Sequence, residues 1–207
     1  MRILPLSLII LAAWAPAVSS LAASYDDPDW PCIQRKVPAL AIGQMWGGPI
    51  PDEIAAADWR PPAELRTAAS EIAPRRVPMQ DVEAKASALV AKVEGSARGE
   101  RLAALFATVL RHLNRERGEI IEGIGRYAHR QKDLSVRVDG MQQELARLEK
   151  APEDERDMDR IEELQDELAW EARVFKERAQ SLSYVCEAPV LIERRAFEIA
   201  RTLAGLV

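Results

Sequence analysis

The feature that most constrains the fold is a three-four repeat of apolar residues that continues without a slip over more than six heptads. Only Arg117 and Gln131 interrupt its apolar character. Such a repeat lines one side of a helix and is typical of a coiled coil. It consists of Ala103, Phe106, Leu110, Leu113, Arg117, Ile120, Ile124, Tyr127, Gln131, Leu134, Val138, Met141, Leu145 and Leu148.

A second repeat with the same spacing follows after a short connection. The connection, 150–154, contains Pro152, which we expect at or near the first position of the second helix. A connection this short makes the two helices antiparallel neighbours, so we predict a coiled-coil hairpin of about 100–150 and 153–204. The second repeat consists of Met158, Ile161, Gln165, Leu168, Ala172, Phe175, Ala179, Leu182, Cys186, Pro189, Glu193, Ala196, Ala200 and Leu203.

The two repeats come into register when the residue numbers of each facing pair add to 306. Large side chains then lie opposite small ones, which supports the register because size was not used to choose it. A parallel dimer of each repeat is the alternative, since Pro189 inside the second helix could disturb the pairing. The predicted layers include Phe106–Ala200, Leu110–Ala196, Tyr127–Ala179 and Leu134–Ala172.

Proline usage divides the rest of the chain. Most prolines fall within 24–78, which predicts a turn-rich arm with short helices at 52–58 and 63–72. The helical domain, 79–207, begins with a helix at 79–93 and breaks between Gly95 and Gly99. We therefore expect an all-α protein in which the hairpin stands on a small three- or four-helix base.

The arm is rich in tryptophan. Trp30, Trp46 and Trp59 stand in proline- and glycine-containing segments that constrain the backbone. We interpret them as anchors that pack the arm against the helices. The alternative is a peptide- or ligand-binding groove built from these aromatic rings.

The first 23 residues have the features of a signal peptide. Arg2 is followed by an apolar run and then by small residues that fit a cleavage site, Ser20-x-Ala22. We predict export to the periplasm or the exterior, with no stable membrane span after cleavage. An uncleaved anchor is the alternative, although the apolar run is short for a span of about 20 residues.

The chain has two cysteines, Cys32 and Cys186. In an oxidising compartment such a pair predicts a disulfide, which here ties the arm to the lower half of the hairpin. The chain-entropy model assigns a loop of this length about 5 kcal/mol of stabilisation.

Composition and motifs argue against several classes of function. The net charge of -5, with acidic and basic residues interspersed, does not suit a nucleic-acid-binding protein. The sequence contains none of the common catalytic or nucleotide-binding motifs, and His112 and His129 lack companions at metal-ligand spacing. We expect no enzyme activity, no cofactor and no metal site.

A binding role in the cell envelope suits the predicted shape best. A projecting hairpin fits an adaptor or scaffold that binds an envelope protein or a second copy of itself. Trp170 falls at the most solvent-facing position of the second repeat, with Val174 one turn further, and both are candidate contact residues. A holdase-type chaperone and an accessory subunit of a periplasmic redox enzyme are the alternatives.

Two charged residues interrupt the repeats. Arg117 lies in the first repeat and Glu193 in the second, one layer apart in the predicted register. A buried charge is costly alone, so we predict that they pair inside the base and fix the register. The alternative is that both side chains extend outward to water.

Overall fold

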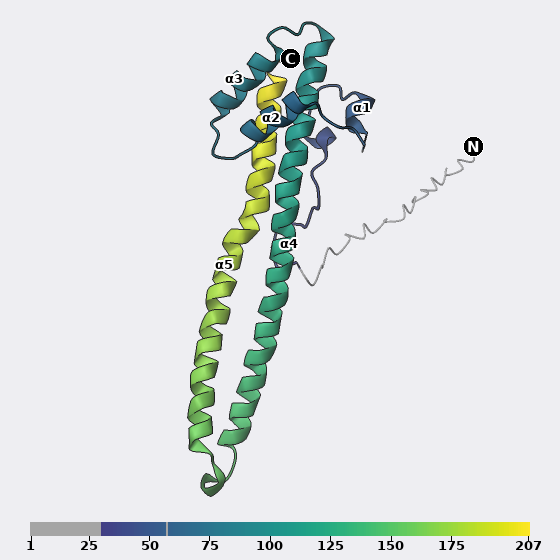
Figure 1. Ribbon diagram of the computed structural model, residues 1–207. Coiled ribbons are helices and arrows are strands. Elements are labelled where there is room, and N and C mark those ends of the chain that lie inside the picture. Colours follow the sequence, from purple (N-terminus) through teal and green to yellow (C-terminus); the bar gives the residue numbers. More distant parts are fainter. Residues whose placement is uncertain (1–29, 57) are drawn as a thin grey trace, which may run out of the picture.

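The computed structural model describes residues 30–56 and 58–207, and every regular element in that part of the chain is a helix (Figure 1). Two long helices, α4 (Ser96–Glu149) and α5 (Met158–Ala204), pack as an antiparallel hairpin. The all-α class and the hairpin are therefore confirmed. The predicted signal peptide, 1–23, lies outside the described residues.

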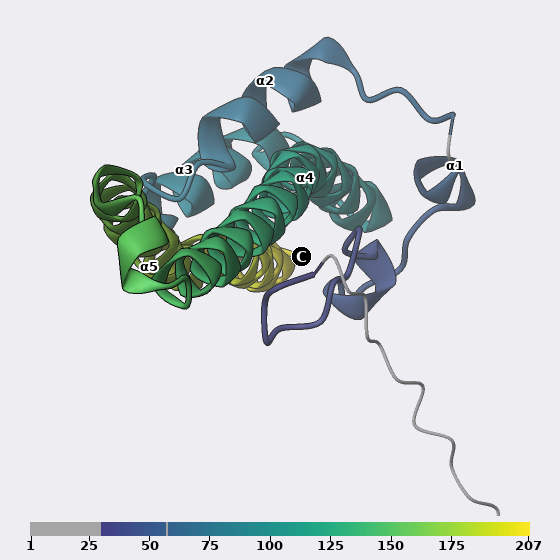
Figure 2. The same cartoon turned by 90° about the horizontal axis from the view of Figure 1, so that it is seen from below.

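The end of the hairpin that holds the C-terminus is thickened into a four-helix base. Helix α2 (Ala63–Ile72) packs on α4, while α3 (Met79–Val90) packs on α5 and α2 (Figure 2). Their apolar faces bury Ile72 and Val82 completely against residues such as Phe106 and Ile199. This shared core explains why the half of the hairpin that belongs to the base is more deeply buried than the projecting half.

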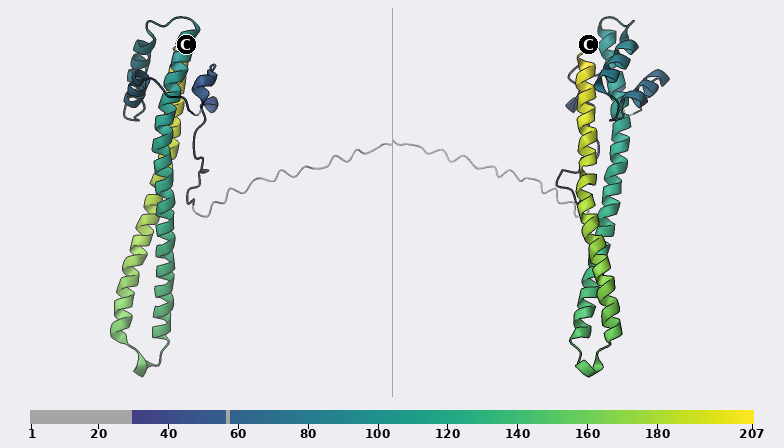
Figure 3. Two further views of the ribbon diagram at one scale, coloured as in Figure 1. Left: turned by 45° about the vertical axis from the view of Figure 1, so that its right-hand side comes forward. Right: turned by 90° about the vertical axis from the view of Figure 1, so that its left-hand side faces the viewer.

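The arm runs along the opposite side of the hairpin from α2 and α3 (Figure 3). It contains a 3-10 turn, η1 (Ile42–Gln44), and one short helix, α1 (Asp52–Ala55). The chain then crosses to α2, whose bounds coincide with the predicted 63–72 segment. Within the described residues, no helix is long and apolar enough to be a membrane span.

The starting residues of the two long helices differ from the prediction. Helix α4 starts directly after Gly95, whose positive φ of 63° favours glycine, and continues through Gly99. At the tip, Pro152 precedes the 3-10 turn η2 (Glu153–Glu155) and does not start α5. Helix α5 begins later because the Asp157 side chain accepts a hydrogen bond from the Arg160 N–H (3.0 Å) and caps it there.

The axial register of the hairpin agrees with the prediction. Gln131 Nε2 donates to the Phe175 carbonyl (2.7 Å), and these residue numbers add to 306. One turn earlier, Tyr127 Oη donates to the Arg178 carbonyl (2.8 Å), which is offset by one residue. Helix α5 also continues through Pro189, so the proline does not disturb the pairing.

The rotation of α5 about its axis differs from the prediction in the projecting half. Leu164 is buried there and Gln165 is exposed, because burying a leucine stabilises the contact more than burying an amide. Ala172 and Ala179 are exposed, so the layers that pair them with Leu134 and Tyr127 are wrong. In the base the members of the predicted layers are all buried in one core, as the predicted seam requires: Phe106, Ala200, Leu110 and Ala196.

We predict that Leu164→Ala lowers the free energy of unfolding by about 2–3 kcal/mol, because it removes a fully buried side chain from a two-helix contact. The matched control, Gln165→Ala, should change it by less than about 0.5 kcal/mol. Urea denaturation followed by circular dichroism measures both. Equal effects of the two variants would contradict the assigned seam.

Candidate functional site

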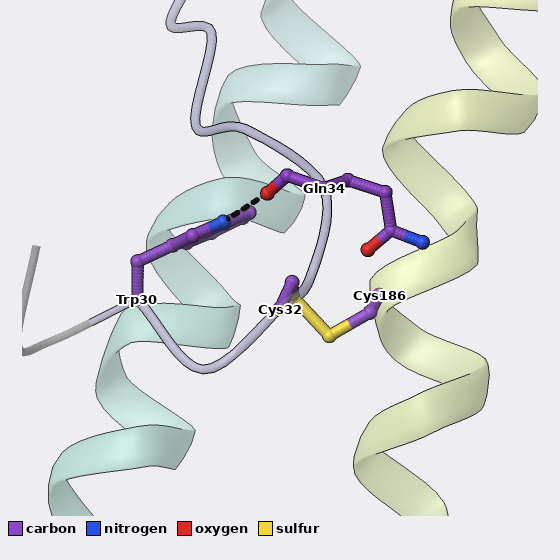
Figure 4. Close-up of a disulfide and its surroundings, with 4 residues drawn as sticks. All are labelled: Trp30, Cys32, Gln34 and Cys186. Atoms are coloured by element: carbon purple, nitrogen blue, oxygen red, sulfur yellow. Dashed lines mark hydrogen bonds between the residues drawn. A yellow bond between two sulfur atoms is a disulfide. The ribbon is translucent and has the colours of Figure 1, made fainter. Parts of the chain in front are cut away.

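A disulfide fastens the arm to the middle of the hairpin. Cys32 and Cys186 are bonded, with their Cα atoms 5.6 Å apart, which confirms the predicted pairing (Figure 4). Just before it, Trp30 Nε1 donates to the Gln34 carbonyl (2.6 Å) and the Lys36 ammonium lies 5.8 Å from the Trp30 ring centre. Trp30 thus organises the loop that carries Cys32.

The other two tryptophans pack the arm against α4. Trp46 is buried and stacks on Phe106, with ring centres 5.7 Å apart and planes inclined by 20°. Trp59 is half-buried under the Arg111 guanidinium, which lies 4.9 Å from its ring centre and donates to its carbonyl (2.5 Å). Both placements agree with the predicted role as packing anchors.

Asn114 holds the arm by its backbone. Its side-chain oxygen accepts from the Leu40 N–H and its amide nitrogen donates to the Leu40 carbonyl, both at 2.9 Å. The amide therefore satisfies both backbone groups of a buried residue, as a neighbouring strand would. Sequence reasoning missed this contact, because a polar residue beside an apolar repeat gives no sign of what it binds.

Arg117 is buried, with only 3% of its surface exposed, but its hydrogen bond goes to the arm. The guanidinium donates to the Val37 carbonyl. Burial lowers the pKa of Arg117 from its ordinary value, and the attraction of Glu193 opposes that shift. The two charges therefore attract, but no ion pair within 4.0 Å joins them in the described structure, and the predicted direct pairing is corrected to this longer-range attraction.

Arg195 is a second buried cation, which sequence reasoning missed. Its guanidinium donates to the carbonyls of Ile72 (2.8 Å) and Ala73 (3.3 Å), which end α2, and to the Met79 sulfur (2.9 Å). A cation at this position satisfies carbonyls that lack intrahelical partners and suits the negative end of the helix dipole. Burial lowers the pKa of Arg195, partly offset by the attraction of Glu198.

Large apolar side chains are exposed along one side of α5. Trp170 is 64% exposed, as predicted, and Tyr184 is 77% exposed. They lie two heptads apart with Glu177 midway, so the three share one side of the helix over about 21 Å. Val174 is half-buried rather than outward-facing, because α5 is rotated toward Leu164.

Val185 extends this side of α5 next to Tyr184. It is 41% exposed, and Pro189, four residues later, has no N–H to donate to its carbonyl. The residue therefore adds an exposed apolar side chain to this side of the helix. We call Trp170, Glu177, Tyr184 and Val185 the α5 outer face.

The described residues contain no group of three or more His, Cys, Asp or Glu side chains placed to hold a metal ion. Searches against protein-family models, curated protein sequences and solved structures return no match. The geometry itself is therefore the basis for a functional proposal.

We predict that Arg195→Met lowers the free energy of unfolding by roughly 2 kcal/mol or more, because two buried carbonyls of α2 lose their donors. Arg194→Met is the matched control, since Arg194 is exposed on the same helix. Its effect should stay within about 0.5 kcal/mol. Chemical denaturation of both variants tests the assignment, and similar values would refute it.

For Arg117 we expect that exchanging the two charges does not restore stability. Arg117→Glu loses the hydrogen bond to the Val37 carbonyl and places a carboxylate near that oxygen. The double variant Arg117→Glu/Glu193→Arg should thus stay destabilised by about 1–3 kcal/mol relative to the parent. Its free energy of unfolding, compared with both single variants, gives the coupling. Recovery to parental stability would show that the charge pair dominates.

Proposed function

We propose that the protein is an exported adaptor that binds a protein partner through the α5 outer face. The observation that carries the proposal is the pair Trp170 and Tyr184, both largely exposed on one side of a projecting helix. Tryptophan and tyrosine are enriched at the centres of protein interfaces, where their large rings give contact area at low entropic cost. A partner helix could contact both rings along two heptads.

The way in which the hairpin is fastened supports this role. The base, the disulfide and the arm contacts lie on the half of the hairpin near the C-terminus and on its middle, so among the described residues no other element covers the half that carries the tip (Figure 1). A preorganised surface loses little conformational entropy when it binds. The disulfide also suits the oxidising compartment that export implies.

A holdase is the less favoured function. Such a chaperone needs a broad apolar surface for many clients, whereas the exposed rings here are separated by charged residues such as Glu177 and Arg178. A role as an accessory subunit of a redox enzyme has no specific observation in its favour.

To test the adaptor role, a photo-crosslinking amino acid replaces Glu177, midway along the α5 outer face, in the full chain expressed in its native cell. We expect one saturable adduct, whose mass identifies either a partner or a second copy of this chain. Trp170→Ala/Tyr184→Ala should weaken capture at least about 30-fold, as expected for loss of a binding hot spot. Its circular dichroism spectrum should remain helical, because both side chains are exposed.

The control carries the same crosslinker in place of Gln143, which is exposed on α4. It should not give the adduct. A ladder of many products that also suppress aggregation of unfolded proteins would favour the holdase. Capture that is unchanged in Trp170→Ala/Tyr184→Ala would contradict the proposal.

A further inference from the structure

A pocket lined by positive charge lies between α4 on one side and α2 with the segment that leads into it on the other. Its volume is about 350 Å³. Three apolar or neutral residues, Pro61, Ala69 and Thr108, complete its lining. Its charged and titratable lining residues are Arg60, Arg66, Arg111, His112 and Arg115, and we call this set the arginine pocket.

Two of the four arginines are held in place by backbone carbonyls. Arg66 donates to the Pro61 carbonyl (2.6 Å). Arg111 donates to the Trp59 carbonyl and lies over the Trp59 ring. Each guanidinium has five N–H donors, so both retain donors for a further acceptor. Their positions are fixed before any ligand arrives.

The other two arginines are uncommitted. Arg60 and Arg115 are exposed, and neither guanidinium has a hydrogen bond or ion pair within the described residues. No nearby carboxylate forms an ion pair with them: Glu64 pairs with Arg101, and Glu116 and Glu119 on α4 form no ion pair with Arg115 in that same part of the chain. Asp58, two residues before Arg60, is likewise exposed and unpaired there.

This concentration of charge contrasts with the rest of the molecule. The chain carries a net charge of -5, yet the lining of the pocket includes four arginines and no carboxylate. Like charges this close repel one another, and an anion that enters the pocket relieves that repulsion. Arginine also matches the oxygens of phosphate in a bidentate geometry that lysine does not provide.

We propose that the arginine pocket binds a phosphate group carried by a small molecule or a phospholipid. A dianionic phosphomonoester suits four guanidiniums better than a single carboxylate does, because it offers more charge and more acceptor oxygens. Arg66 and Arg111 form the fixed part of the site, and Arg60 and Arg115 close on the ligand. The proposal is independent of the α5 outer face, so either can fail without the other.

The test uses the full mature chain at near-physiological ionic strength, where weak surface attraction is screened. Inorganic phosphate and glycerol 3-phosphate are titrated by calorimetry, and vesicles that contain phosphatidic acid, a phosphomonoester lipid, are compared with phosphatidylcholine vesicles by flotation. We expect saturable binding to at least one phosphate probe. Arg60→Ala/Arg115→Ala should weaken it about tenfold or more, because two charge-assisted contacts are lost.

The charge-matched control is Arg130→Ala/Arg173→Ala, which removes two exposed arginines elsewhere on the hairpin and should bind like the parent. Arg60→Lys/Arg115→Lys keeps the charge and should show an intermediate loss, since lysine lacks the forked donor geometry. Pocket-dependent binding to soluble probes identifies a free ligand, and pocket-dependent binding to vesicles alone identifies a lipid. No binding to any probe, or an equal loss in the control, overturns the proposal.

Discussion

The contact between α4 and α5 is the interaction on which the remaining structure depends, because every other element is attached to one of these helices. Helix α2 packs on α4 and α3 packs on α5, so the base forms only when both long helices lie side by side. The arm likewise follows α4, through Trp46 on Phe106 and Asn114 on Leu40. In the base, further helices exclude water from the seam, whereas in the projecting half two helices alone bury fewer side chains.

Several contacts that attach the arm are hydrogen bonds to its backbone. It has little regular secondary structure, so its carbonyls and N–H groups need partners from outside. Side chains of α4 supply them: Asn114 binds Leu40, Arg117 binds Val37 and Arg111 binds Trp59. These side chains bind the backbone of the arm, while the buried Leu40 side chain and the Trp59 ring under Arg111 add contacts of their own.

The sequence predicted the axial register of α4 and α5 well, but it did not predict the rotation of α5 about its own axis. Heptad periodicity specifies how far along the axis two helices pair, and the Gln131–Phe175 contact agrees with the predicted register. It does not specify rotation by part of a turn, which is why Leu164 takes the place assigned to Gln165. The roles of Arg117 and Arg195 depend on carbonyls far away in the chain, at Val37 and Ile72, and no local pattern encodes such partners. The arginine pocket was missed for the same reason, since its residues come from two separate segments.

The position of the disulfide has a mechanical consequence. Cys32 and Cys186 are separated by 154 positions in the sequence, and their bond closes this part of the chain into a covalent ring. The ring contains α2, α3, α4 and the hairpin tip. A pulling force applied at residue 30 and at the C-terminus passes through the disulfide into the last turns of α5, 187–207. The α5 outer face at Trp170 and Tyr184 lies outside that load path, whereas Ile192, Ala196 and Ile199 of the base core lie on it. Tension along the chain therefore acts first on the part of α5 between Cys186 and the C-terminus, while the projecting hairpin keeps its shape.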